Sequence, residues 1–303
     1  MMTKYLLVAR HLLKTFGLLD MISDYLWMTR HIKHEIDFLK NKTSLNRNKI
    51  SDEITAVILT VGHSKFIEKC IESIENQTLQ PHYIEIIRDV KPFSKASQAA
   101  LDSVKTPFYV SIDDDMILHK HCFKRLYYYI TKDSKCAETI LRLKDPILDR
   151  IYGVHMYRSG VIKQIGFHPL YDEKGCERKM SRSIESLGFG SLYIDVIGGQ
   201  HRPVYTPEDA FWKYKFIGEQ AVYYQSDKGA EVMVRSMDRL SEYWMQTHAD
   251  VALFAMAGLL AGLTSDNPSG QLTYKGREEQ TMINKMEERL QSIPFGFCPR
   301  RPR

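Results

Sequence analysis

Between residues 54 and 118 short apolar runs alternate with amphipathic stretches, and this alternation constrains the fold more than any other feature. Ile54–Val61 is almost entirely apolar, as in strands that are buried on both faces of a parallel sheet. Apolar residues then recur at helical spacing in Phe66–Ile74. A second run (Tyr83–Ile87), a second helical stretch (Ser94–Val104) and a third run (Phe108–Ile112) follow. Short connections between such segments predict an open α/β sheet.

Length and composition place the chain among globular proteins with one main domain and additions. A hydrophobic content of 44% and a charged content of 26% exclude a disordered class. The net charge of +5 is spread along the chain, which favours anionic partners only weakly, and no nucleic-acid-binding motif is present. The five cysteines form no Cys-x-x-Cys pair, and their odd number does not suit a disulfide framework. We therefore expect a protein of the reducing cytoplasm.

The third apolar run ends in three consecutive carboxylates, Asp113, Asp114 and Asp115. If the strand continues through them, Asp113 and Asp115 project to one side and Asp114 to the other. Two carboxylates in one pocket repel each other unless a cation lies between them, and oxygen ligands suit Mg²⁺ or Mn²⁺. A solvated acidic turn is the alternative for an isolated triplet.

Thr60, Asp89 and the aspartate triplet each lie at the end of a predicted strand. In open α/β sheets ligands bind beyond the carboxyl ends of the strands, so one pocket can collect all of these side chains. Each also has a purely structural alternative, because Thr60 can cap the helix that follows it and Asp89 can serve as a turn residue.

The ordered set of these motifs resembles the nucleotide-binding half of the GT-A glycosyltransferases, specifically the inverting enzymes of family 2. The matching residues are Val57–Thr60, Asn76-Gln77-Thr78, Asp89, Ser97–Ala100 and Asp113-Asp114-Asp115. The resemblance covers about residues 54–220. It implies a GT-A (Rossmann-like) fold, a mainly parallel sheet flanked by helices, with helical N- and C-terminal extensions.

The resemblance also implies roles for these residues. Thr60 and Asp89 would contact the nucleoside of a UDP-sugar, Asp113 would lie near its ribose, and Asp114 would belong to the same donor-binding set. Asp115 would hold the cation, Mn²⁺ or Mg²⁺, that bridges the diphosphate. UDP is only preferred over other nucleotides, because the turn after the first strand and the residues around Asp89 depart from the family pattern.

A catalytic base is expected on a later helix, which in family 2 ends in glycine and an aromatic residue. Aligning Gly188-Phe189 with that ending places Glu177 at the base position and Cys176 where the family has glutamate. Glutamate and aspartate have similar ordinary pKa values, so either can take the proton of an acceptor hydroxyl. Asp172 and Glu173 are the alternative bases, and a helix N-terminal acid is the non-catalytic alternative for Glu177.

By the same resemblance His201 stands where many GT-A enzymes place a metal-binding histidine, after a strand at Tyr193–Ile197. Imidazole is acceptable to Mn²⁺ and less so to Mg²⁺. The Glu208-Asp209 pair has the same sequence as the Glu-Asp dipeptide that contains the catalytic base in the family. However, Thr206 as N-cap, Pro207 at the first helical position and acids in the first turn predict a helix start instead.

The two ends of the chain are predicted to be helical additions. Apolar residues recur at helical spacing up to about residue 40, but charges interrupt them, so no segment there suits a membrane span or a signal peptide. We expect this helix to pack on its own domain, the alternative being peripheral contact with an anionic membrane. Asp238–Leu263 is predicted to be a helix whose apolar end is buried or forms a homo-oligomer contact. The predicted domains are an N-terminal extension and linker (1–50), a GT-A catalytic domain (51–225) and a C-terminal helical region with a basic tail (226–303).

These features predict a cation-dependent inverting glycosyltransferase of the hexosyltransferase type. It would move a sugar from a nucleotide-sugar donor to a hydroxyl of a glycan or lipid-linked acceptor, in the cytoplasm or at the inner face of the membrane. The alternatives are a catalytically silent nucleotide-sugar-binding protein and a sugar nucleotidyltransferase. The latter should carry a glycine-rich loop with a basic residue after the first strand, where this chain has only Gly62.

Overall fold

The computed structural model describes most of the chain between residues 18 and 264. The described ranges are 18–41, 49–62, 64–146, 149–168, 176–202, 205–224, 240, 249–264 and 283–284. The chain divides into two compact units. Unit 1 takes its residues from Met1–Lys144, Arg150–Phe167 and Met180–His201, and unit 2 from Asp145–Asp149, His168–Lys179 and Arg202–Arg303.

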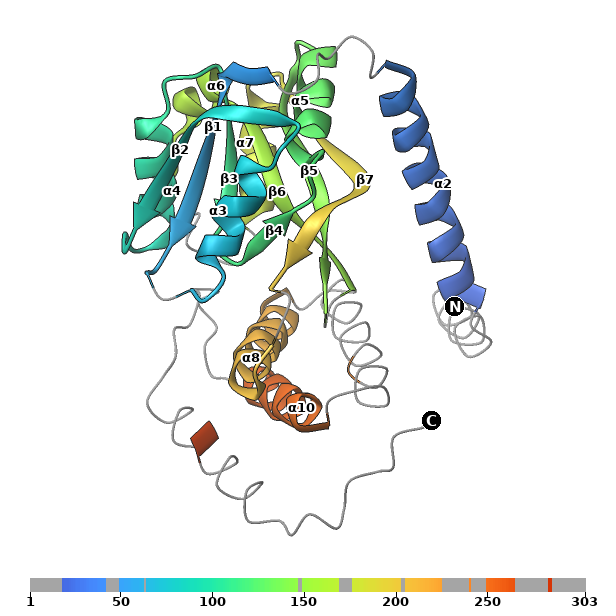
Figure 1. Ribbon diagram of the computed structural model, residues 1–303. Coiled ribbons are helices and arrows are strands. Elements are labelled where there is room, and N and C mark those ends of the chain that lie inside the picture. The colour runs from blue at the N-terminus through green and yellow to red at the C-terminus, as the bar shows by residue number, and fades with distance from the viewer. Residues whose placement is uncertain are drawn as a thin grey trace. The chain divides into compact units, whose positions relative to one another are not determined.

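Seven strands form one mixed sheet in the order β2-β1-β3-β6-β5-β7-β4 (Figure 1). β1 is parallel to both β2 and β3, and β5 is parallel to β7, whereas β3/β6 and β4/β7 are antiparallel. The predicted α/β fold class is therefore confirmed. The strands are β1 (Lys49–Thr60), β2 (Leu79–Arg88), β3 (Phe108–Asp113), β4 (Met116–Leu118), β5 (Cys136–Asp145), β6 (Asp149–Arg158) and β7 (Gly190–His201).

Helices flank the sheet, and their apolar faces complete its core (Figure 1). Alternate residues of β1, such as Ile54 and Ile58, point to one face and are fully buried with Ile74 of α3 and Phe123 of α5. Helices α5 and α6 lie outside the segments that the sequence pattern predicted. The helices of this region are α3 (Ile67–Glu75), α4 (Phe93–Ser103), α5 (Cys122–Lys132), α6 (Ser159–Ile165) and α7 (Cys176–Ser186).

The apolar run around the aspartate triplet is broken, which the alternation pattern did not predict. β3 ends at Asp113, the chain turns at Asp114 and Asp115, and β4 then pairs with β7 at the edge of the sheet. A turn abolishes the two-residue period of a strand. The condition for Asp113 and Asp115 to project to one side, a strand that continues through the triplet, is therefore not met.

Two predicted helix ends are confirmed by their capping geometry. α7 ends before Gly188, which adopts a left-handed φ of 79°, as glycine does after helices. α8 (Pro207–Tyr224) begins directly after Thr206, whose hydroxyl oxygen accepts a hydrogen bond from the Asp209 backbone N–H. In return the Thr206 backbone N–H donates to the Asp209 carboxylate, so this acid serves as part of a helix cap.

The N-terminal helix α2 (Leu18–Asn41) packs on the sheet and on α5 within unit 1, as predicted; the part of the predicted helix before Leu18 lies outside the described residues. Phe38 is 2% exposed, and the Arg125 guanidinium lies over its ring. The Glu35 and Asp37 carboxylates form ion pairs with Arg125 and with Lys132 of α5, at 2.7 and 2.8 Å. One face of α2 is thus held by apolar burial and by salt bridges.

In unit 2, α8 packs closely on α10 (Ala249–Leu263) through glycines. A methyl group at Gly258 would lie 2.1 Å from the Phe211 carbonyl oxygen, and one at Gly262 equally close to that of Lys215. Only glycine permits backbones to approach to this distance. α10 covers the apolar end of the helix predicted over Asp238–Leu263, and one face of it is buried, as predicted; residues 241–248 lie outside the described part of the chain. No described helix combines the length and the apolar character that a membrane crossing requires.

Candidate functional site

Parallel pairing brings the ends of β1, β2 and β3 together, as predicted. Thr60 pairs with Arg88, and Leu59 with Asp113, so the residues that follow these strands meet at the carboxyl edge of the sheet. The Asp89 backbone N–H donates to the Thr60 carbonyl at 2.9 Å. Thr60, Asp89 and the aspartate triplet therefore share one edge.

The turn after β1 holds the Asp89 carboxylate beside a glycine. A methyl group at Gly62 would lie 3.1 Å from each carboxylate oxygen of Asp89. Gly62 has φ of 83°, and Asp89 itself has φ of 55°, a region that non-glycine residues rarely adopt. The absence of a side chain at Gly62 leaves the exposed Asp89 carboxylate room at the edge of the site.

Thr60 links this turn to the middle aspartate. Its hydroxyl accepts a hydrogen bond from the Gly62 backbone N–H at 3.0 Å and donates one to the Asp114 carboxylate. The Ser64 hydroxyl donates to the Asp114 carbonyl oxygen. Asp113, the last residue of β3, is exposed. Thr60 and Asp114 are thus joined by a hydrogen bond, and Asp113 next to them is exposed to solvent.

The third aspartate meets a histidine from a distant part of the chain. The antiparallel register pairs Met116 of β4 with His201 of β7, so Asp115 lies beside His201. His201 Nε2 is 3.5 Å from Asp115 Oδ1, and both side chains are largely buried. The two predicted metal-binding residues are therefore brought together.

The chemistry of this pair suits a divalent cation. Ligand atoms about 2.1 Å from a common ion can lie 3.5 Å apart, and carboxylate with imidazole is a better donor set for Mn²⁺ than for Mg²⁺. Among the described residues no group of three or more His, Cys, Asp or Glu side chains is arranged to hold a metal ion. Asp115 and His201 would therefore need further ligands, and the oxygens of a bound diphosphate are the usual complement.

Gly199 controls how closely β7 approaches β4. A methyl group at this position would lie 2.4 Å from the Ile117 carbonyl oxygen and 2.9 Å from Leu118 Cα. Both neighbours are backbone atoms of the strand that positions Asp115. The spacing of Asp115 and His201 therefore depends on this glycine.

We expect Gly199→Ala to separate β4 from β7 and to weaken Mn²⁺ binding, because the added methyl group cannot be accommodated without moving backbone. The affinity for Mn²⁺ should fall at least about fivefold, as overpacking of about 1 kcal/mol or more would produce. Titration of the full chain with Mn²⁺ measures this, with Gly190→Ala in the same strand as control, since no atom lies within 4 Å of a methyl group there. Equal affinity in Gly199→Ala and wild type would contradict the assignment.

The triplet produces a strongly negative environment. Burial, followed by the charges of Asp114, Asp113 and Asp115, raises the pKa of the Cys70 thiol to about 12. This thiol therefore stays protonated at neutral pH and is no nucleophile. The same field attracts a cation to this edge of the sheet.

The Asn76-Gln77-Thr78 motif stabilises the segment that follows β4. The Gln77 amide donates to the Ser73 and His119 carbonyl oxygens at 2.9 Å and accepts from the Phe123 backbone N–H at 3.0 Å. The Thr78 backbone N–H donates to the Lys120 carbonyl oxygen. The motif thus connects the end of α3 to the segment between β4 and α5.

The predicted base lies at the beginning of α7. Glu177 is the second residue of this helix, and its side chain is outside the part of the chain that the structure describes. The alternative bases, Asp172 and Glu173, also lie outside the described residues. Their roles stay predictions.

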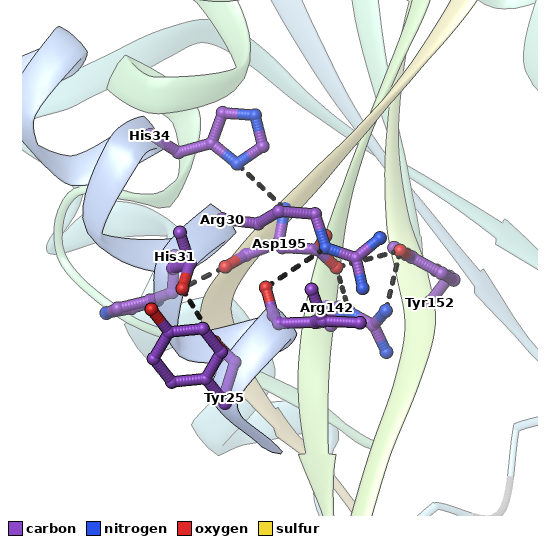
Figure 2. Close-up of polar contacts among 9 residues, drawn as sticks. Tyr25, Arg30, His31, His34, Arg142, Tyr152 and Asp195 are labelled. Atoms are coloured by element: carbon purple, nitrogen blue, oxygen red, sulfur yellow. Dashed lines mark hydrogen bonds and ion pairs between the residues drawn. The ribbon is translucent and has the colours of Figure 1, made fainter. Parts of the chain in front are cut away.

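Sequence reasoning missed a cluster of polar side chains around the buried Asp195 in the middle of β7. Figure 2 shows its carboxylate near Arg30 of α2, Arg142 of β5 and Tyr152 of β6. The ion pairs are 3.1 and 2.7 Å long, and the Tyr152 hydroxyl donates at 3.0 Å. Burial by itself raises the pKa of Asp195, but Arg142 and the other donors hold that pKa below its usual range. The Asp195 backbone N–H also donates to His34 of α2, so this cluster joins the helix to the sheet.

A second buried cluster, equally unpredicted, surrounds Glu138 of β5, which is fully buried. His155 Nδ1 lies 2.9 Å from its carboxylate, and the hydroxyls of Ser181 and Ser191 donate to the same group. Ser181 belongs to α7, the helix that carries Glu177. Pairs of this kind have no signal in a single sequence, because their partners are distant along the chain.

No protein-family model matches the chain, and no curated protein matches its sequence. Several solved structures are similar to this chain in three dimensions at low sequence identity. A mannosyltransferase, PcManGT from Pyrobaculum calidifontis, in complex with GDP-Man and Mn²⁺, is 11% identical with a TM-score of 0.44 over 89% of this chain and 92% of the other. Residues 1–349 of TarS from S. aureus are 11% identical with a TM-score of 0.41 over 80% of this chain and 81% of the other. A CMP:2-keto-3-deoxy-manno-octonic acid synthetase complexed with CTP has a TM-score of 0.36 at 11% identity, over 48% of this chain and 91% of the other.

Proposed function

We propose that this chain is a cation-dependent inverting glycosyltransferase of the GT-A type, similar to family 2. It would transfer a sugar from a nucleotide-diphosphate donor, with UDP-sugars preferred, to a hydroxyl of a glycan or lipid-linked acceptor. The observation that carries this proposal is the approach of Asp115 to His201 at the edge of the sheet that also presents Thr60, Asp89 and Asp114. A cation site beside polar groups suited to a nucleoside is what such a donor requires.

Different residues would bind different parts of the nucleotide-sugar donor. Asp115 and His201 would hold Mn²⁺ or Mg²⁺ together with the diphosphate oxygens. When bound, the cation neutralises the charge that develops on the departing diphosphate. The exposed carboxylates of Asp89 and Asp113 are acceptors suited to ribose hydroxyls or base N–H groups. Thr60 holds Asp114 in place beside them.

Glu177 is the proposed base. In a single displacement the acceptor oxygen attacks the anomeric carbon while the bond from that carbon to the diphosphate breaks. The hydroxyl proton passes to the Glu177 carboxylate, and the diphosphate leaves with the electron pair. A positioned base contributes roughly 10²- to 10⁴-fold to such a step.

We expect Glu177→Gln to retain donor binding and to lose 10²- to 10⁴-fold in turnover, because the amide cannot accept the proton. The test is a screen of nucleotide-sugars with Mn²⁺ or Mg²⁺ that follows the released nucleotide diphosphate, with donor binding measured separately. Glu185→Gln, an exposed glutamate of the same helix, is the control. Unchanged turnover in Glu177→Gln would refute its role and direct attention to Asp172 and Glu173.

The screen also separates the other classes. Donor binding without turnover in the wild-type chain would identify a silent nucleotide-sugar-binding protein. Release of pyrophosphate from a nucleoside triphosphate and a sugar phosphate would identify a nucleotidyltransferase. Either result would overturn the proposed transfer reaction.

A further inference from the structure

α2 has a second apolar face that its packing on unit 1 does not use. Tyr25, Met28, Ile32, Ile36 and Leu39 are each between 45% and 64% exposed. Their spacing places them within about 80° of one another around the helix, away from the buried Phe38. We call these five residues the outer stripe. Such a row is costly in water unless a partner covers it.

A basic pocket adjoins the outer stripe. It has a volume of about 1120 Å³ and lies between α2 and the beginnings of β5 and β7. Its lining includes Lys33 and Lys40 of α2 together with Lys132 and Lys135, against only two acidic residues. One of these, Asp37, is already paired with Lys132 at 2.8 Å. We call this the lysine pocket, and its positive excess suits an anionic group.

Stripe and pocket are continuous, because Ile32 and Ile36 belong to both. Leu192 of β7, itself 36% exposed, adds a further apolar group to the pocket. A row of apolar side chains that passes directly into a group of lysines matches a molecule with a negative headgroup beside a hydrocarbon chain. Interfacial helices show this combination of an apolar face and flanking lysines.

We propose that α2 seats unit 1 on the surface of an anionic lipid bilayer. The outer stripe enters the boundary between headgroups and acyl chains, and the lysine pocket binds lipid phosphates. The opposite face of α2 stays bound to the sheet through the Asp195 cluster, so the helix attaches the domain rigidly (Figure 2). A second copy of the chain suits the surface less well, because it would bring the same excess of lysines to the contact.

This site is separate from the candidate active site. Gly190 at the start of β7 lines the pocket, whereas His201 is the last residue of the same strand. A strand of this length separates the two by roughly 30 Å. Lipid binding and sugar transfer can therefore be tested independently.

Co-sedimentation of the full chain with vesicles tests the proposal. The wild type should bind vesicles that contain phosphatidylglycerol and should not bind pure phosphatidylcholine vesicles. Each lysine near an anionic surface contributes a factor of about five, so Lys33→Ala/Lys40→Ala should bind about 25-fold more weakly. Ile32→Ser/Ile36→Ser should lose roughly tenfold or more, because less apolar area enters the bilayer.

Matched controls remove the same groups elsewhere. Lys95→Ala/Lys105→Ala takes the same charge from exposed positions outside the pocket, and Leu260→Ser removes an exposed apolar residue from α10. Both should bind as the wild type does. Far-UV circular dichroism verifies that each variant is folded, which is expected because none of the replaced side chains contacts the Asp195 cluster.

Three results would overturn the proposal. The first is wild-type chain that stays in the supernatant with phosphatidylglycerol vesicles. The second is equal binding by the pocket variants and the controls. The third is a dimer, detected by light scattering, that becomes monomeric in Ile32→Ser/Ile36→Ser while vesicle binding is unchanged, which would assign the outer stripe to a second copy.

Discussion

Replacing Asp115 by asparagine is expected to abolish cation-dependent binding of the nucleotide-sugar while the fold is retained. The amide has the shape of the carboxylate, but it carries no charge to hold Mn²⁺ beside His201 Nε2, which is 3.5 Å away. Loss of a cation that contributes several kcal/mol should reduce turnover about 10³-fold or more. Calorimetric titration with UDP-sugars, with and without Mn²⁺, measures the binding directly.

The control for this variant is Asp102→Asn, which removes a carboxylate from α4, where Gln98 donates to it at 2.8 Å. That variant should bind donor as the wild type does. His201→Ala should resemble Asp115→Asn if the two side chains share one ion. Donor binding that is insensitive both to Asp115→Asn and to a chelator would refute the cation site.

Truncating Glu138 to alanine is expected to cost about 3–5 kcal/mol of unfolding free energy. The change removes the acceptor that His155 Nδ1 and the hydroxyls of Ser181 and Ser191 share, and breaking a buried pair from one side has this cost. Urea unfolding followed by circular dichroism measures the loss. The exposed Glu72→Ala on α3 is the control and should stay within about 0.5 kcal/mol of the wild type.

The same residue predicts a pH dependence. Burial alone raises the pKa of Glu138, but the hydrogen bond and the charge of His155, together with hydrogen bonds from Ser191 and Ser181, more than offset this, so its pKa in the folded state is lowered from the ordinary value. A depressed carboxyl pKa stabilises the fold above the unfolded-state pKa, and this contribution is lost as the pH falls through the folded-state value. The stability of Glu138→Gln should therefore change less between pH 5 and pH 3 than that of the wild type. Parallel curves for the two proteins would show that Glu138 does not contribute in this way.

The alternation of apolar runs and amphipathic stretches was sufficient to predict the α/β class and the edge at which Thr60 and Asp89 meet. Parallel strands present their carboxyl ends on one side, so adjacency in the sheet follows from local pattern and connection length. The helix boundaries at Gly188 and Thr206 were also predictable, because helix capping involves only residues that are neighbours in the sequence.

The apolar pattern did not predict the turn that interrupts the strand at the aspartate triplet. Apolar residues flank Asp113, Asp114 and Asp115 on both sides as in one continuous strand, but the chain turns there to begin β4 at the edge of the sheet beside β7. The reason is tertiary: β4 obtains its hydrogen bonds from β7, and Gly199 allows the two backbones to approach. Only this pairing turns Asp115 toward His201.

The sequence by itself thus determined the class of fold, the capped helix ends and the sheet edge at which the polar side chains meet. These features depend on local periodicity, on contacts between neighbours in the sequence and on the parallel arrangement of strands that are joined through helices. Tertiary structure alone decided the approach of Asp115 to His201, the two buried clusters around Glu138 and Asp195, and which face of α2 is left exposed. Each of these features depends on contacts between residues that are far apart in the chain. Their energies come from burial and charge pairing that exist only after the chain has folded.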